Sequence, residues 1–236
     1  MEDAWQIFED RHQVRFYDHE KVPSKELIEK VLHKAHDLVP SKQNLMPYVI
    51  KILGPEHTKI KEDMYKLSCE VEYPDEVKRN DKRLGKYKVY TDYGFPPNKR
   101  FPEGNSQLFA PYVLILIPRK PTYNIGLANE YVKQGTVNKD QITLQPTVSK
   151  VEIGMFSVCF TTAAIEEGLS VSYTACLNGA KLRNHYSWLK EEEHHPTLAL
   201  SVGYPRIDKE TGTETYHRHT LKYENKPSKN ETFRWI

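Results

Sequence analysis

The sequence predicts one domain of the α+β or mixed α/β class, with helices and strands interspersed around about four strands. Three observations predict this class. Three segments place apolar residues at helical spacing, four others are short apolar runs of strand length, and the 236 residues contain no internal repeat. A chain of this length can bury one large core, so we expect a single domain over residues 1–236.

The first helical pattern follows Ser24. Its apolar stripe consists of Leu27, Ile28, Val31, Leu32 and Ala35. Ser24 is a suitable N-cap, because its side-chain oxygen can accept a hydrogen bond from an N–H of the first turn. The helix should end before Pro40, since a residue preceding proline is disfavoured in the helical conformation.

Two predicted strands flank an irregular region. Tyr48–Leu53 and Tyr112–Ile117 are apolar runs of strand length, and the second is continuous, which predicts burial on both faces. Between them, a short helix has its buried side at Ile60, Met64 and Leu67. Residues 73–107 are charged and rich in Tyr and Pro, without a period, and predict an insert that covers or flanks a site.

The longest helix is predicted between Val148 and Glu167, with Gly168 as a left-handed C-terminal cap. Apolar and small residues lie on most of its sides, so we expect it to be buried, either centrally or against a second subunit. Ser170–Ala175 and Thr197–Tyr204 predict two further strands. The polar, unpatterned chain from Arg206 onward predicts an extended arm.

Composition argues against several classes of protein. The 34 basic and 32 acidic residues leave a net charge of +2, which gives no general attraction to nucleic acid or membrane. Cys69, Cys159 and Cys176 form no Cys-x-x-Cys pair, so neither a disulfide framework nor a cysteine zinc site is predicted. No apolar run reaches the roughly 20 residues of a membrane span and no signal segment is evident, so we expect a cytoplasmic protein.

Two polar segments could bind an anion. Arg11, His12 and Arg15 lie within five residues, and the rigid fork of arginine suits a phosphate or the carbonyl-rich edge of a ring. Taken alone, a solvated basic turn is the favoured interpretation. The loop Pro40–Asn44 is dense in side-chain donors, and taken alone a simple connector between helix and strand is the favoured interpretation.

Two further features contain residue types found in catalytic or metal sites. The strand after Gly168 ends near Cys176, where backbone N–H groups can face a ligand. A lone cysteine is more often a small buried residue than a nucleophile. His217 and His219 form a His-x-His pair without a third ligand at a recognisable spacing, so a polar tail is favoured and no metal site is predicted.

Together, the order and spacing of these segments resemble the nitroreductase family of FMN enzymes. Arg11–Arg15 stands where that family has Arg-(Arg/His)-Ser-x-(Arg/Lys), with Gln13 in place of serine. Val22–Leu27 matches its Val-Pro-x-x-x-Leu helix start. Pro40–Tyr48 matches Pro-Ser-x-x-Asn-x-Gln-Pro-Trp except at Met46 and Tyr48. The series is completed by Ala110-Pro111, Gly154, Glu167-Gly168-Leu169 and Val202-Gly203-Tyr204-Pro205.

The resemblance implies a central, mostly antiparallel sheet of four to five strands flanked by helices, in an intertwined homodimer with FMN at the interface. It assigns Arg11, His12 and Gln13 to the phosphate and ribityl chain, and Arg15 to the N1 and C2 carbonyl edge of the flavin. Other implied FMN-binding residues are Pro40, Ser41, Lys42 and Asn44 of the loop contributed by the partner, Asn105 at the pyrimidine ring, Tyr173, Thr174, Ala175 and Cys176 along the flavin ring, and Lys226 at the phosphate.

The activity that the resemblance implies is hydride transfer from NADH or NADPH, through flavin N5, to an electron-poor acceptor such as a nitroaromatic or a quinone. A ping-pong order is expected, in which the protein positions the cofactor and sets its potential. The backbone N–H of Cys176 would lie near N5. Two alternatives remain open: specialised flavin chemistry, such as dehalogenation or flavin fragmentation, and a non-catalytic flavin-binding or interaction protein.

Overall fold

The computed structural model describes residues 6–7, 11, 14, 16–41, 45–69, 106–119, 134–135, 146–175, 177–192 and 194–206. The predictions for most of the insert at 73–107 and for the arm after Arg206 lie outside these residues.

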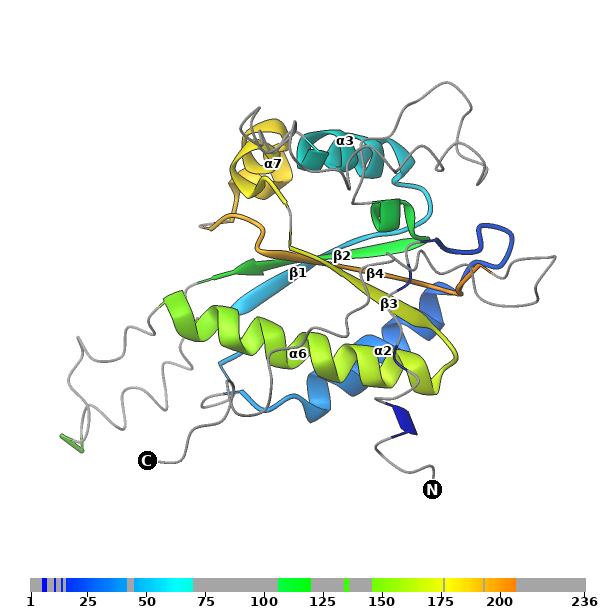
Figure 1. Ribbon diagram of the computed structural model, residues 1–236. Helices are drawn as coiled ribbons and strands as arrows, with labels where there is room; N and C mark the ends of the chain where they lie inside the picture. Colours follow the sequence, from blue (N-terminus) through cyan, green and yellow to red (C-terminus); the bar gives the residue numbers. More distant parts are fainter. Residues whose placement is uncertain are drawn as a thin grey trace, which may run out of the picture.

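A four-stranded antiparallel sheet forms the centre of the chain (Figure 1). Its strands, in the spatial order β1-β2-β4-β3, are β1 (Tyr48–Leu53), β2 (Tyr112–Pro118), β3 (Ser170–Thr174) and β4 (Leu198–Gly203). All four predicted strands are confirmed within a residue or so of their ends. Because every pair is antiparallel, the fold belongs to the α+β class and not to the mixed α/β class.

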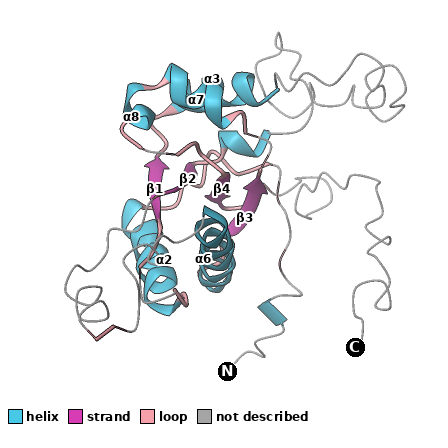
Figure 2. Cartoon of the chain, turned by 90° about the vertical axis from the view of Figure 1, so that its left-hand side faces the viewer, coloured by secondary structure: helices cyan, strands magenta, loops and turns pink. Residues whose placement is uncertain are grey.

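Helices cover both faces of this sheet (Figure 2). On one face lie α2 (Lys25–Leu38) and α6 (Pro146–Glu166), and on the other lie α3 (Thr58–Cys69), the 3-10 helix η4 (Ser106–Phe109), α7 (Gly179–His185) and α8 (Ser187–Lys190). Leu114 and Leu116 point to the first layer, and Ile115 points to the second. Strand β2 is therefore buried along its whole length, as its continuous apolar sequence predicted.

The predicted ends of two helices are confirmed by their hydrogen bonds. The Ser24 hydroxyl accepts a hydrogen bond from the N–H of Leu27 at 3.2 Å, so it caps α2. At the end of α6, Gly168 has a φ of 71° and the N–H of Leu169 donates to the Ala164 carbonyl at 2.9 Å. Glycine adopts this left-handed conformation without steric cost, and it turns the chain directly into β3.

The long helix α6 is buried on the side that faces the sheet and open on another. Phe156 and Phe160 are 2% and 0% exposed, whereas Val151 and Val158 are 57% and 47% exposed. Helix α6 is therefore buried on the face that packs on the core, as expected. Another apolar face of the helix is exposed in the single chain. None of the helices in the described part of the chain is both long and apolar enough to cross a membrane.

Hydrogen bonds hold the N-terminal segment against the end of β4 and against β3. The Tyr17 hydroxyl donates to the Ser201 carbonyl at 2.8 Å, and the N–H of Asp18 donates to the Tyr204 carbonyl at 2.9 Å. Three residues before Tyr17, the carbonyl of Val14 accepts a hydrogen bond from the Ser172 hydroxyl of β3. These contacts fix the course of the chain just after Arg11.

Candidate functional site

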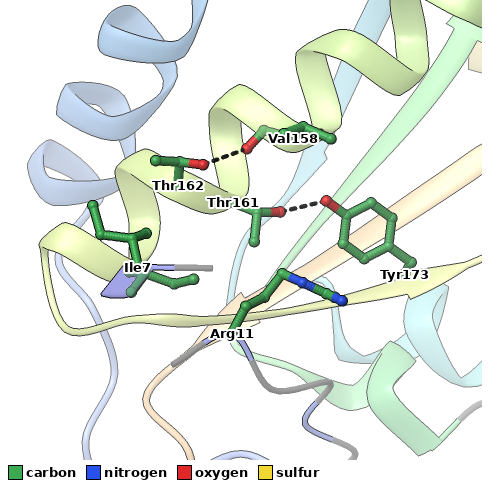
Figure 3. Close-up of a pocket in the computed structure, with 7 residues that line it drawn as sticks. Ile7, Arg11, Val158, Thr161, Thr162 and Tyr173 are labelled. Carbon is green, nitrogen blue, oxygen red and sulfur yellow. Dashed lines mark hydrogen bonds between the residues drawn. The ribbon is translucent and has the colours of Figure 1, made fainter. Parts of the chain in front are cut away.

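A pocket of about 380 Å³ lies between the N-terminal segment, helix α6 and strand β3 (Figure 3). Its lining consists of Ile7, Arg11, Val158, Thr161, Thr162, Ile165 and Tyr173. The walls are mostly aliphatic or aromatic, with threonine hydroxyls and one guanidinium among them. A ligand that combines an apolar, planar part with an anionic group matches this lining.

Tyr173 is held against α6 by its hydroxyl group. The hydroxyl donates to the Ser157 carbonyl at 2.8 Å and lies 2.6 Å from the Thr161 hydroxyl. Burial raises the pKa of Tyr173, and both the contact with the Thr161 hydroxyl and the charge of Arg11 oppose that rise. The phenol is therefore neutral at physiological pH, and the ring is a fixed wall of the pocket.

The buried hydroxyl of Thr161 has a structural partner of its own. Its side chain is 2% exposed and donates to the Ser157 carbonyl, four residues earlier, at 2.7 Å. Hydroxyl groups inside a helix often bond this way, because the carbonyl one turn back is within reach. The arrangement gives β3 and α6 a shared polar contact at the pocket and fixes their spacing there.

Arg11 supplies the charge of the pocket. Its side chain is exposed at the rim and extends along the pocket toward Tyr173 (Figure 3). Its influence on the pKa of Tyr173 agrees with this proximity. A guanidinium beside an apolar cavity can bind a phosphate with two parallel hydrogen bonds.

The structure brings together two of the residues predicted at the flavin, Arg11 and Tyr173, which lie far apart in the sequence. Thr174 does not line the pocket, since it is buried and accepts a hydrogen bond from the Gln107 side chain at 2.6 Å. Ala175 is exposed immediately after β3. The strand ends one residue earlier than predicted.

Two loop residues lie away from this pocket. Pro40 and Ser41 are not among its lining residues, and Ser41 instead contacts Glu152 near the start of α6. The resemblance assigned this loop to the site of a partner subunit, so a separate location within one chain is compatible with that expectation. The other predicted residues, His12, Gln13, Arg15, Lys42, Asn44, Asn105, Cys176 and Lys226, lie outside the described residues.

Several lining residues were not predicted from the sequence. They are Ile7, Val158, Thr161, Thr162 and Ile165. One signal was available, because Ser157 and Thr161 place two hydroxyls four residues apart in a stretch of α6, residues 153–165, that contains no charged residue. In the part of the chain that the structure describes, no group of three or more His, Cys, Asp or Glu side chains could hold a metal ion.

Comparison with known proteins supplies the family. A sequence model described as the Nitroreductase family matches residues 8–204. The chain belongs to the nitroreductase family. This match includes the N-terminal segment, the whole sheet and both residues, Arg11 and Tyr173, that share the pocket.

Solved structures agree in fold at low sequence identity. A BluB-like flavoprotein from Clostridium difficile 630 has a TM-score of 0.61 and 16% identity, with 100% of each chain covered. A nitroreductase-like protein from Streptococcus mutans has a TM-score of 0.57 and 16% identity, covering 86% of this chain and 88% of the other. A candidate NAD(P)H:FMN oxidoreductase from Staphylococcus epidermidis ATCC 12228 has a TM-score of 0.56 and 14% identity, with 92% of each chain covered. The comparison with curated proteins finds no match.

Proposed function

We propose that this nitroreductase-family protein is an FMN-dependent oxidoreductase that transfers hydride from NADH or NADPH to an electron-poor acceptor by a ping-pong mechanism. The observation that carries the proposal is the shared pocket of Arg11 and Tyr173, which were both expected at the flavin. The family match supports an oxidoreductase. The solved relatives include a flavoprotein and a candidate NAD(P)H:FMN oxidoreductase, which supports the choice of cofactors.

The residues present fit FMN in charge and in shape. Arg11 would bind the phosphate, while Tyr173 and the aliphatic side chains of α6 would contact the uncharged parts of the cofactor. His12, Gln13 and Lys226 would add donors to the phosphate and ribityl chain. Arg15 and Asn105 would face the pyrimidine ring, and the backbone N–H of Cys176 would lie near N5.

FMN, when bound, supplies a ring that accepts a hydride from the nicotinamide and passes it to the acceptor in a second half-reaction. The work of this chain is then to position and to enclose. The hydrogen bonds that fix Tyr173 keep one wall rigid, and the aliphatic side chains of Val158 and Ile165 would exclude water from a bound cofactor once a second copy covers them. Arg15 would stabilise negative charge on the reduced ring and so raise its potential.

We also propose that the protein works as a homodimer in which each site is completed by a second copy. The exposed apolar face of α6, with Val151 and Val158, supports an interface. Among the described residues, a Cβ atom at Gly154 would have no neighbour within 4 Å apart from the backbone of its own helix. Val158 also lines the pocket. A second chain covering this face would therefore cover the pocket, and its Pro40, Ser41, Lys42 and Asn44 would contribute to it.

An absorption experiment tests the proposed function. Protein reconstituted with FMN should show a flavin spectrum that NADH or NADPH bleaches without oxygen, and a nitroaromatic or quinone should restore it after the nucleotide is removed. The second step distinguishes a ping-pong order. A bound flavin that neither nucleotide bleaches would favour specialised flavin chemistry, and the absence of FMN binding would contradict the enzyme proposal.

A further inference from the structure

The loop between α2 and β1 is tied to α6 by a buried carboxylate. The Ser41 hydroxyl donates to Oε2 of Glu152 at 2.6 Å, and Glu152 is only 3% exposed. A serine hydroxyl has one proton to donate, and a carboxylate is a strong acceptor for it. In this arrangement the proton of Ser41 is already engaged within its own chain.

The same hydroxyl oxygen also fixes the far end of the loop. It accepts a hydrogen bond from the N–H of Met46 at 3.0 Å. Met46 has a φ of 43°, a left-handed conformation that residues other than glycine seldom adopt. Such a conformation persists when its surroundings hold it, and Ser41 provides one of those contacts.

A second contact joins Met46 to the core beneath α6. The Tyr48 hydroxyl lies 3.2 Å from the Met46 sulfur and donates to it, and the Tyr48 ring lies 5.6 Å from that of Phe156. Burial and then the nearby charge of Glu152 raise the pKa of Tyr48 to about 12. Met46 and Tyr48 are the two positions at which the loop departs from the family motif, and they are linked here to each other and to Glu152.

We propose that Glu152 is a positioning residue for this loop: it holds Ser41, and through Ser41 it holds Met46, in the conformation that serves the cofactor site. The inference rests on the proposed function for its effect on FMN. It assigns to Ser41 a role in shaping the loop, and not the role of a direct hydrogen-bond donor to the flavin. Pro40 then lies next to the residue that fixes the loop to α6, and Met46, toward the other end of the loop, is held by that same residue.

Three variants test this role. Glu152→Leu removes the acceptor, Ser41→Ala removes only the hydroxyl, and Glu152→Gln is the matched control because its amide oxygen can still accept from Ser41. The dissociation constant of FMN is measured by quenching of flavin fluorescence. We expect Glu152→Leu and Ser41→Ala each to weaken binding about tenfold, the order expected for a lost hydrogen bond to a charged group. The double variant should be no weaker than either single one, and Glu152→Gln should bind as the wild type does.

Hydrogen exchange at the amide of Met46, measured by NMR on the FMN-free protein, gives a readout that does not depend on cofactor. This amide should exchange faster in Glu152→Leu and Ser41→Ala than in the wild type, with Glu152→Gln unchanged. If the wild type fails to bind FMN, the proposed function fails while this measurement still tests the loop.

Two results would overturn the inference. In the first, Ser41→Ala weakens FMN binding and Glu152→Leu does not, which identifies Ser41 as a direct donor. In the second, exchange at Met46 stays unchanged in Ser41→Ala. This variant deletes a single half-buried hydroxyl, so it keeps the test available if Glu152→Leu does not fold.

Discussion

Arg11 is the charged residue of a pocket whose other lining residues are apolar or carry a hydroxyl. An exposed arginine contributes little to stability by itself, since solvent screens its charge. Beside apolar walls that displace water, the same guanidinium binds an anion more strongly. The position of Arg11 at the rim, and not its presence in a basic turn, therefore supports the binding role that we propose for it.

Replacing Arg11 should weaken FMN binding without unfolding the protein. We expect Arg11→Ala to raise the dissociation constant by about 10- to 100-fold, which corresponds to a lost charge-assisted hydrogen bond of about 1.5–3 kcal/mol. Flavin fluorescence quenching measures it. Lys25→Ala is the control, because Lys25 is an exposed cation in a 3.5 Å surface pair with Glu29. Equal affinities for both variants would show that Arg11 does not contact the phosphate.

Among the residues that line the pocket, Arg11 and Tyr173 were predicted from the sequence and Thr161 was not. The first two stand in segments whose order and spacing resemble those of the nitroreductase family, and that resemblance assigned both residues to the flavin. Thr161 is one small residue within a helix that is apolar on most sides, and its importance depends on Tyr173, which arrives from a strand. A contact between two elements cannot be inferred from the pattern of either element alone.

Among the elements, α3 is joined to the short connection between η4 and β2 by the buried side chain of Lys61. Its Nζ donates to the carbonyls of Ala110 and Pro111 at 2.8 and 2.7 Å, and the side chain is 4% exposed. Burial lowers the pKa of Lys61 to about 8, against a smaller opposite effect from Glu56. The ammonium is thus bound by neutral carbonyls that only partly replace its hydration.

This lysine should make the protein more stable as the pH rises from about 8 to 10. The pKa is about 8 when folded and near 10.5 when unfolded, so within this range the unfolded chain binds more protons. The free energy of unfolding should then rise by roughly 1–2 kcal/mol. Urea unfolding at several pH values measures it, and Lys61→Met should lose the increment.

The pH range in this test ends at 10 for a physical reason. Tyr48 and Tyr186 have pKa values near 12 in the folded protein and about 10 in the unfolded one, so above pH 10 they lower stability and would mask the lysine. Parallel stability curves for the wild type and Lys61→Met would contradict the assignment.

Elements with a sustained apolar pattern were predicted, and short ones were missed. The apolar stripe along α2 is typical of a helix, and the unbroken apolar run of β2 is typical of a buried strand. Helices α7 and α8 each bury a single leucine, Leu182 and Leu189, which makes no period. One cue existed, since Asn178 accepts a hydrogen bond from the N–H of Lys181 at 3.0 Å and caps α7.

For the whole molecule, the number of strands was predictable and their order was not. Strand β2 pairs with β4 across most of the chain, although β3 lies between them in sequence. Hydrophobic runs identify strands but carry no information about which strand lies beside which. The exposed side of α6 shows a similar limit, because its sequence allowed a central helix or an interface and the fold leaves Val151 and Val158 uncovered.

A charge on this uncovered face should separate the proposed dimer. Val158→Glu would bury a carboxylate in an apolar interface, and we expect light scattering after gel filtration to show a shift from dimer to monomer. Thr58→Glu is the control, since it adds the same side chain at the exposed start of α3 on the opposite face of the sheet, where the helix N-terminus tolerates it. A Val158→Glu protein that remains dimeric would place the interface elsewhere.

A crystal structure of the protein with FMN would show whether the pocket between Arg11, α6 and Tyr173 binds the flavin. We predict flavin density in this pocket, with the phosphate within hydrogen-bond distance of the Arg11 guanidinium and the Tyr173 hydroxyl still bonded to the Ser157 carbonyl. Flavin density at another place on the molecule, with this pocket containing only solvent, would contradict the claim.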